Sequence, residues 1–249
     1  MNKIFLICLF LFVSIIVVIV FLYYPLYSNK IQGQYYIAHA GGQIDGYNYT
    51  NSLESVENSI RQGIEYIELD FAFTSDSVLV CTHEWEGLDA DEGLSFLEFI
   101  SRKVYGKYTP LTAFMVDSIL AVNPSLHLVL DKISDFRVID RYFKKYKDRV
   151  VVECFSDEDY LKFHENDYFL PMMSLSPNKK HFIYRKLKHL LDKRYPLCRF
   201  YVMGLKAYED IKDFPPVSVG VFGCKNKMQA DSLFRTNKNI NLVYIDDVN

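Results

Sequence analysis

The chain has 249 residues, of which 50% are apolar and 16% aromatic, so it can bury the core of one large domain or two small ones. Charged residues make up 24% and the formal net charge is −3, which excludes a disordered chain and leaves no basic surface of the kind that binds nucleic acid. The mean hydropathy of −0.01 excludes a protein with many membrane spans. The apolar residues are nevertheless concentrated at the N-terminus.

The N-terminal apolar run covers residues 4–22 and contains no charged residue. A helix of about 19 residues is roughly 28 Å long, which is close to the thickness of the hydrocarbon core of a bilayer. Pro25 can end this helix. A cleaved signal peptide is the alternative, but its apolar run is shorter and no Ala-x-Ala cleavage pattern follows here. We therefore expect residues 1–27 to form a membrane anchor with a single transmembrane helix and residues 28–34 to form a linker.

The orientation of this predicted anchor depends on the flanking charges. Lys3 precedes the apolar run and Lys30 follows it, so the positive-inside bias is slight. The N-terminal tail is very short, which favours a tail that stays inside. We expect the large domain to lie on the exported side of the membrane, either periplasmic or extracellular.

Beyond the linker, strand-like apolar runs alternate with helical stretches. The strand-like runs are 35–38, 66–71, 78–82, 126–130, 150–155, 172–175, 200–203, 217–222 and 242–245. The helical stretches are 51–64, 94–104, 113–122, 134–146, 157–165, 179–193 and 226–235. About eight strand–helix units in roughly 215 residues predict an α/β fold in which a closed (β/α)8 TIM barrel spans residues 35–249. A doubly wound open sheet is the alternative, but no GxGxxG or P-loop pattern supports it.

Polar residues at the helix starts suggest their caps. Asn51 precedes the first predicted helix and Glu54 follows three residues later, which is the spacing of a capping box. Ser134 is in the position of an N-cap for the helix that begins there.

Side-chain alternation places three acids on the inner face of the predicted barrel. In Ile67-Glu68-Leu69-Asp70 the aliphatic residues face the helices, so both acids project inward, and Asp131 takes the inner face of a later strand. Inward acids at strand ends are costly unless they bind a partner, and hard cations prefer oxygen ligands. Glu68, Asp70 and Asp131 therefore predict a site for one divalent cation, Ca²⁺ or Mg²⁺. Pairing of these acids with lysine or arginine is the alternative.

Two histidines follow strand-like runs. His39 ends the first run and precedes Gly41 and Gly42, which let the backbone come close to a ligand, while His83 ends the third run. Two histidines beside a metal suit the general acid–base chemistry of phosphoryl transfer. A structural role is the alternative for each, and we expect His127 to have such a role inside the barrel.

The order of these residues resembles the glycerophosphodiester phosphodiesterase family, which are metal-dependent barrel enzymes of the phosphatidylinositol phospholipase C-like superfamily. The resemblance begins at residues 37–41, where the family has His-Arg-Gly, and continues at 49–52, in place of the family's Pro-Glu-Asn-Thr. It is strongest over residues 63–83, GIEYIELDFAFTSDSVLVCTH. Weaker similarity extends the resemblance over residues 35–249.

The resemblance implies the roles of five residues. His39 and His83 correspond to the acid–base pair, and Glu68, Asp70 and Asp131 correspond to the ligands of one divalent cation. The implied function is a phosphodiesterase that hydrolyses glycerophosphodiesters to an alcohol and glycerol phosphate. Attack by a neighbouring hydroxyl of the substrate and attack by water both stay open.

Several positions depart from the family pattern. Ala40 replaces the arginine that follows the first histidine, and Thr50 replaces the glutamate of the second motif. Lys132 is adjacent to Asp131, whereas the family's lysine comes two residues after its carboxylate. Strand alternation predicts that Lys132 points outward, unless a bulge redirects it.

Three further residues are candidates for binding the substrate. Glu153 lies on the inner face of the next strand, where it either compensates for the acid that is absent at position 50 or pairs with a lysine. Lys206 and Lys225 are candidates to bind phosphate in place of the arginine that is absent at position 40.

Two other functions compete with the first. A phospholipase C- or D-type hydrolase of lipid head groups uses the same type of barrel, and it predicts an apolar rim around the mouth. A catalytically weak barrel that binds a phosphorylated envelope component is suggested by Ala40 and Thr50. The complete set of histidines and carboxylates favours an enzyme over a binding protein. Its expected partners are a phosphodiester or phospholipid-derived substrate and, through the N-terminal apolar run, a membrane.

Overall fold

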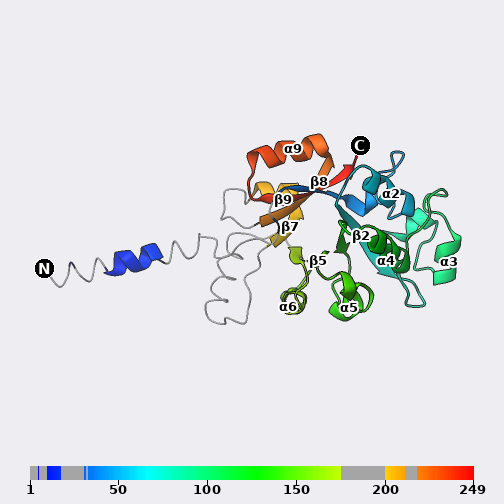
Figure 1. Ribbon diagram of the computed structural model, residues 1–249, viewed down its shortest axis with the longest axis horizontal. Helices are drawn as coiled ribbons and strands as arrows, with labels where there is room; N and C mark the ends of the chain where they lie inside the picture. The colour runs from blue at the N-terminus through cyan, green and yellow to red at the C-terminus, as the bar shows by residue number, and fades with distance from the viewer. Residues whose placement is uncertain (1–4, 6–9, 18–30, 32, 175–199, 211–217) are drawn as a thin grey trace.

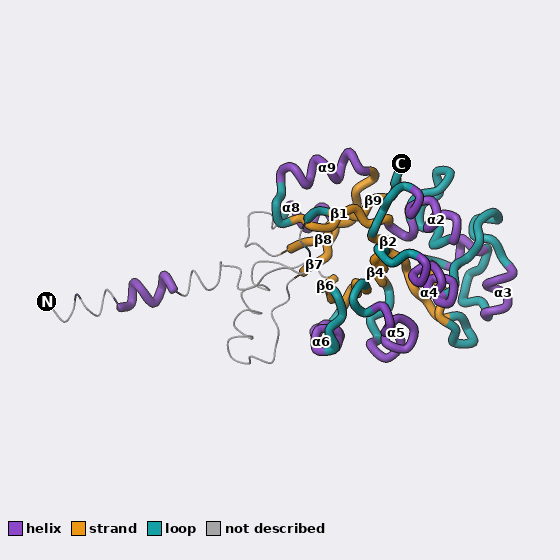
Figure 2. Tube along the Cα trace, viewed as in Figure 1, coloured by secondary structure: helices purple, strands orange, loops and turns teal. Residues whose placement is uncertain are grey.

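The computed structural model describes residues 5, 10–17, 31, 33–174, 200–210 and 218–249. Within them, eight parallel strands form a ring in the order β1-β9-β8-β7-β6-β5-β4-β2, and pairing of β1 with β2 closes it. The strands are β1 (Tyr35–Ala38), β2 (Tyr66–Phe73), β4 (His127–Asp131), β5 (Val150–Cys154), β6 (Leu170–Ser174), β7 (Phe200–Gly204), β8 (Ser218–Asn226) and β9 (Ile240–Asp247). Figure 2 shows these strands at the centre, with helices outside them. The predicted (β/α)8 barrel is confirmed.

The helices follow the strands along the chain. They are α2 (Leu53–Arg61), α3 (Phe96–Ser101), α4 (Ala113–Val122), α5 (Phe136–Phe143), α6 (Asp157–Glu165), α8 (Leu205–Glu209) and α9 (Lys227–Thr236). Short 3₁₀ turns are η1 (His39–Gly41), η2 (Trp85–Leu88) and η3 (Lys144–Tyr146). In Figure 1, α3 lies at the periphery, on the side of the barrel where α2 and α4 pack. The predicted helix 179–193 lies outside the described residues.

The third strand-like run of the sequence forms β3 (Leu79–Cys81), which is not a strand of the barrel. β3 pairs antiparallel with the end of β2, whereas β2 pairs in parallel with β4 to continue the ring. A tight turn joins β2 to β3, and the Oγ1 of Thr74 accepts a hydrogen bond of 2.9 Å from the backbone N–H of Val78 within it. β3 therefore extends β2 as a hairpin beyond the carboxyl end of the barrel.

The alternation of side chains divides the core into two layers. Ile67 and Leu69 belong to the apolar layer between the ring and the helices, whereas Tyr66 and Val129 belong to the interior of the barrel. His127 also lies at this interior, where it stacks on Tyr66 with ring centroids 4.4 Å apart. The same alternation directs the side chains of Glu68 and Asp70 into the barrel.

The first helix is shorter than the predicted 51–64, and its N-cap lies one residue later than the predicted Asn51. The N-cap of α2 is Ser52, whose hydroxyl accepts from the backbone N–H of Ser55, while the hydroxyl of Ser55 accepts from the N–H of Ser52. The prediction of Asn51 as the cap is wrong, because its side chain binds Asp70 instead. At α5 the cap is likewise Asp135 rather than Ser134.

The N-terminal segment is described only in part. Residues 1–4, 6–9 and 18–30 lie outside the described residues, and residues 10–17 are helical. Among the residues that the structure describes, no helix combines the length and the apolar character that crossing a bilayer requires. The anchor at 1–27 and the linker at 28–34 stay predictions from the sequence.

Candidate active site

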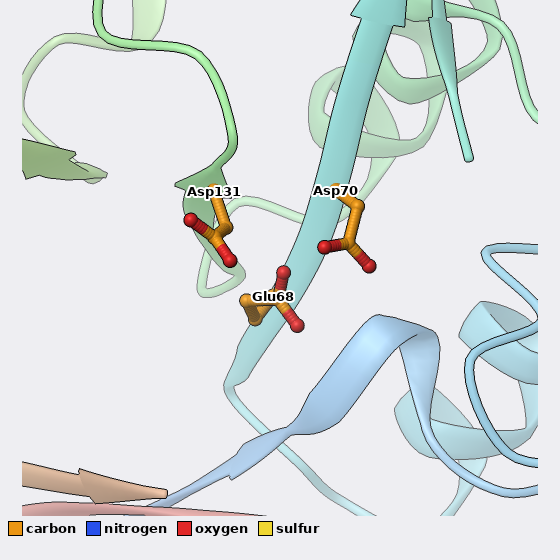
Figure 3. A group of neighbouring side chains, drawn as sticks. All are labelled: Glu68, Asp70 and Asp131. Carbon is orange, nitrogen blue, oxygen red and sulfur yellow. The ribbon is translucent and has the colours of Figure 1, made fainter. Parts of the chain in front are cut away.

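Three carboxylates meet at the carboxyl ends of two neighbouring strands. Glu68, Asp70 and Asp131 each offer an oxygen, and these oxygens lie within 4.8 Å of one another. β2 and β4 are paired in register with Asp70 opposite Asp131, and Figure 3 shows the three side chains pointing toward one another. The structure therefore brings together the three acids that the sequence proposed as metal ligands.

The environment of these acids fits a divalent cation. Glu68 is only 1% exposed, and its Oε1 has no hydrogen-bond partner among the described residues, while its Oε2 accepts a hydrogen bond of 2.6 Å from the N–H of Ala40. Burial, and then the charges of Asp70 and Asp131, raise the pKa of Glu68 well above its ordinary value. A buried oxygen without a partner is costly, and a cation bound by the three carboxylates both satisfies it and offsets their repulsion.

Asn51 holds Asp70 in place through two hydrogen bonds. Its Nδ2 donates to Oδ2 of Asp70 over 2.9 Å, and its Oδ1 accepts from the backbone N–H of Asp70 over 3.0 Å. Asn51 is fully buried and has a φ of 45°, a left-handed conformation that asparagine adopts more readily than most residues. The sequence did not predict this role. The signal for it is the place of Asn51 in the stretch that resembles the Pro-Glu-Asn-Thr motif.

His39 is paired with an acid from the far end of the chain. Its Nδ1 lies 2.9 Å from Oδ1 of Asp246, which belongs to β9, the neighbour of β1 in the ring. A carboxylate that faces Nδ1 keeps the proton on that nitrogen and leaves Nε2 free to accept one. Asp246 was missed in the sequence, where an acid at the end of the last strand is the only signal for it.

His83 reaches the same end of the barrel from the segment after β3. The ring of Tyr49 contacts both imidazoles, with its centroid 4.8 Å from that of His39 and 4.9 Å from that of His83. The Nδ1 of His83 also lies 3.5 Å from Oε1 of the exposed Glu84. The two histidines of the sequence prediction therefore lie around one tyrosine.

Lys132 points toward the site, so the outward direction predicted from strand alternation is wrong. Its φ is 62°, which is left-handed, directly after the last residue of β4. Its Nζ donates to the carbonyl oxygen of His83 over 2.7 Å and lies 3.8 Å from Oδ1 of Asp70. Alternation holds only while the backbone stays extended, and the backbone leaves that conformation at this residue.

Glu153 faces the interior of the barrel, as its position in the strand predicts. It is 4% exposed and accepts a 2.5 Å hydrogen bond from the hydroxyl of Tyr244, and within the described residues it forms no ion pair with a lysine. Burial, and then the charge of Asp131, raise the pKa of Glu153 to about 8. It lies near the three gathered acids but is not one of them.

The two lysines that the sequence suggested as phosphate ligands do not contact the three carboxylates within the described residues. Lys206 lies in α8 after β7, Lys225 lies in β8, and both are exposed. Within the described residues no hydrogen bond or ion pair joins either lysine to the three carboxylates. Ala40 is buried with its backbone N–H committed to Glu68, and Thr50 is buried with its Oγ1 3.0 Å from the Oγ of Ser52.

Together the fold and the site define a class of protein. They describe a (β/α)8 barrel that gathers carboxylates and histidines at the carboxyl ends of its strands, which is where TIM-barrel enzymes hold their active sites. Residues 40–95, which include Glu68, Asp70 and His83, match the model of the glycerophosphoryl diester phosphodiesterase family. Over this segment the chain is similar to that family, and solved structures of phosphodiesterases share its barrel.

Solved structures share the barrel at low sequence identity. A phosphodiesterase from Oleispira antarctica, in complex with the product sn-glycerol-3-phosphate, has a TM-score of 0.63 and 17% identity, over 87% of this chain and 93% of that chain. One glycerophosphodiester phosphodiesterase from Parabacteroides distasonis has a TM-score of 0.64 and 15% identity, over 87% of this chain and 94% of that chain. A second from that organism has a TM-score of 0.63 and 15% identity, over 91% of this chain and 86% of that chain. No curated protein matches the sequence.

Proposed function

We propose that this protein is a metal-dependent phosphodiesterase that hydrolyses glycerophosphodiesters to an alcohol and glycerol phosphate. The observation that carries the proposal is the buried Oε1 of Glu68, which lacks a partner among the described residues and lies in a carboxylate cluster beside two histidines. The match of residues 40–95 to the family model supports this activity, and the glycerol phosphate product in the Oleispira antarctica structure agrees with the substrate class.

Glu68, Asp70 and Asp131 are the residues that hold the divalent cation, Ca²⁺ or Mg²⁺. When bound, the cation neutralises negative charge on the non-bridging oxygens of the phosphodiester. The chain positions its ligands beforehand. Asn51 fixes Asp70 with two hydrogen bonds, and the N–H of Ala40 holds one oxygen of Glu68 so that the other stays free for the cation.

His39 is the general base. Its Nδ1–H faces Asp246, so its Nε2 removes the proton from the attacking hydroxyl, whether that hydroxyl belongs to the substrate or to water. The carboxylate of Asp246 then stabilises the imidazolium. His83 donates a proton to the leaving alkoxide as the bond from phosphorus to that oxygen breaks. If a hydroxyl of the substrate attacks, the cyclic phosphate is opened by water with the two histidines in exchanged roles.

Lys132 supplies the positive charge that is absent at position 40. Its ammonium lies beside Asp70 and is oriented by the carbonyl oxygen of His83. An ammonium in this place attracts the phosphate group and lies close to the histidine that protonates the leaving group. The left-handed backbone at Lys132 turns the side chain inward, although Lys132 directly follows Asp131 in the chain.

Kinetics on the purified full-length chain test this proposal. Glycerophosphocholine and glycerophosphoethanolamine are incubated with Ca²⁺ or Mg²⁺, and glycerol phosphate is quantified. Chelation is expected to stop its release and cation to restore it. His39→Ala and His83→Ala are expected to lower the rate by roughly 10² to 10⁴, whereas His164→Ala, on α6 outside the ring, serves as the matched control. Hydrolysis that continues without a cation contradicts the proposal.

A second candidate function is hydrolysis of phospholipid head groups, and one observation favours it. Phe155 directly follows β5 and is 46% exposed, and Phe222 pairs with the last residue of β7 and is 41% exposed. Both lie at the carboxyl end of the barrel, where an apolar rim suits a substrate with an acyl chain. Incubation with lysophosphatidylcholine micelles separates the possibilities: released choline or phosphocholine supports a lipid substrate, and binding without turnover supports a non-enzymatic barrel.

We also propose that residues 1–27 anchor the protein in a membrane and that the barrel lies on the exported side. The support is the uncharged apolar run at 4–22 in the sequence. Carbonate extraction of membranes is expected to leave the full chain in the pellet and to release a variant that lacks residues 1–27. Protease added to intact cells, after removal of any outer barrier, tests the orientation. Release of the full chain by carbonate contradicts the anchor.

A further inference from the structure

Tyr49 contacts both histidines of the site. It lies in the segment between η1 and α2, its side chain is 40% exposed, and its ring lies 4.8 Å from that of His39 and 4.9 Å from that of His83. Its φ is 56°, which a bulky residue seldom adopts, and such backbone conformations persist where the surroundings hold them. The ring therefore has a defined place at the mouth of the barrel.

Nearby carboxylates determine the electrostatic surroundings of the Tyr49 hydroxyl. Within the described residues it makes no hydrogen bond, although the carboxylates of Asp246, Asp70 and Glu68 act on it electrostatically. Burial, and then these three charges, raise the pKa of Tyr49, so the hydroxyl keeps its proton. A protonated donor is thus available on a ring that contacts both imidazoles.

The position of the reacting phosphorus follows from the two histidines. The base and the acid of an in-line displacement act on the entering and leaving oxygens, so the phosphoryl group must lie within reach of both imidazoles and beside the carboxylate cluster. Tyr49 contacts both imidazoles, so its ring lies next to this position. The side chain of Ala40 offers no donor, and the N–H of Ala40 is already bonded to Glu68.

We propose that the Tyr49 hydroxyl donates a hydrogen bond to a non-bridging oxygen of the bound phosphodiester. This hydrogen bond helps to replace the arginine side chain that is absent at position 40. This inference rests on the proposed phosphodiesterase function. It assigns Tyr49 a contact with the phosphate group that the substrate and the glycerol phosphate product share. A competing role is purely spatial, in which the ring only keeps the two imidazoles apart.

Tyr49→Phe separates these roles, because it keeps the ring and removes the donor. The matched control is Tyr47→Phe, which removes a hydroxyl from the same loop, since Tyr47 is 45% exposed and stacks on Tyr105 instead of on a histidine. Steady-state hydrolysis of glycerophosphocholine and calorimetric binding of sn-glycerol 3-phosphate, both with Ca²⁺ on the full chain, are the two measurements. Thermal melting checks that both variants fold.

The Tyr49→Phe variant is expected to lose roughly 10- to 100-fold in kcat/KM and a similar factor in affinity for glycerol phosphate, because it loses a hydrogen bond to a charged group. The Tyr47→Phe control is expected to match the wild type in both measurements. Wild-type values for Tyr49→Phe in both measurements overturn the proposal, and so does a loss of rate with unchanged affinity for glycerol phosphate. Failure of the proposed function is distinct from this, because the wild type itself then hydrolyses no diester, and the affinity for glycerol phosphate still decides the role of Tyr49.

Discussion

The Nδ1 of His39 lies 2.9 Å from the Oδ1 of Asp246, although 207 positions separate the two residues along the chain. The first barrel strand and the last are neighbours because the ring closes there. The hydrogen bond that sets the proton position on the imidazole is therefore made only when the whole barrel is assembled. The chemistry of His39 depends in this way on the last strand of the fold.

Replacing Asp246 by asparagine tests this dependence. The amide keeps the shape of the side chain but removes the charge that holds the proton on Nδ1, so we expect kcat to fall roughly 10²- to 10⁴-fold with little change in KM. Asp247→Asn is the matched control, since it alters the same strand at the next residue. Steady-state kinetics on a glycerophosphodiester provide the measurement, and an unchanged kcat in Asp246→Asn rules out the role.

Glu68→Gln tests the metal site independently of turnover. Loss of one of three charged ligands is expected to weaken the binding of Ca²⁺ or Mg²⁺ by roughly 10²-fold or more, as measured by calorimetry. Without a cation, the variant is expected to melt at a higher temperature than the wild type, because glutamine cannot ionise and so removes the cost of burying this carboxyl group beside Asp70 and Asp131. Glu65→Gln, at an exposed position before the same strand, is the control. Equal cation affinity in Glu68→Gln and the wild type contradicts the assignment.

Lys132→Met removes the ammonium but keeps an unbranched side chain. Because this charge lies beside Asp70 and the carbonyl of His83, we expect KM to rise about tenfold and kcat to fall. The same substitution at Lys206 and at Lys225 tests the two positions that the sequence suggested. We expect smaller changes in KM and kcat for those two variants. A larger loss of kcat/KM in Lys225→Met or Lys206→Met than in Lys132→Met would assign the phosphate contact to that lysine instead.

Glu153 makes the stability of the metal-free protein depend on pH. Its pKa in the folded protein is about 8, above the ordinary value of 4.5, so its contribution to stability is complete below the ordinary value and is lost as the pH rises toward 8. The free energy of unfolding is expected to fall by on the order of 3 kcal/mol between pH 5 and pH 8 from this group. The raised pKa values of Glu68 and Asp131 act in the same direction.

Urea unfolding of the chelated protein at several pH values measures this dependence. Glu153→Gln is expected to unfold with a shallower pH dependence, because the amide cannot ionise, and the wild type is expected to lose part of its dependence when Ca²⁺ or Mg²⁺ is added. A wild-type free energy of unfolding that rises from pH 5 to pH 8 contradicts the expected sign. Equal dependence in the wild type and in Glu153→Gln removes this residue as the cause.

The barrel and the placement of its acids could be predicted from the sequence because both follow from local periodicity. Side chains alternate along a strand, so Ile67 and Leu69 facing the helices require Glu68 and Asp70 to face inward. The observed limits of α4 and α6 are also the predicted ones. The first residue of each helix follows a polar N-cap, and the apolar residues that mark the helix lie within a few residues of that cap.

Other features depend on contacts that no local pattern encodes. An apolar run such as β3 does not reveal whether its neighbour runs parallel or antiparallel. Asn51 has the position of a helix cap, yet the approach of β2 gives its side chain a stronger partner in Asp70.

The sequence by itself determined the alternation of strands and helices, the closed barrel and the inward direction of Glu68, Asp70 and Asp131, because these depend on the repeat of the backbone over a few residues. Only the tertiary structure decided the partner of His39, the inward turn of Lys132 and the position of Tyr49 between two histidines. Each of these depends on a left-handed residue or on the closure of the ring, which sets distances between residues far apart in the chain.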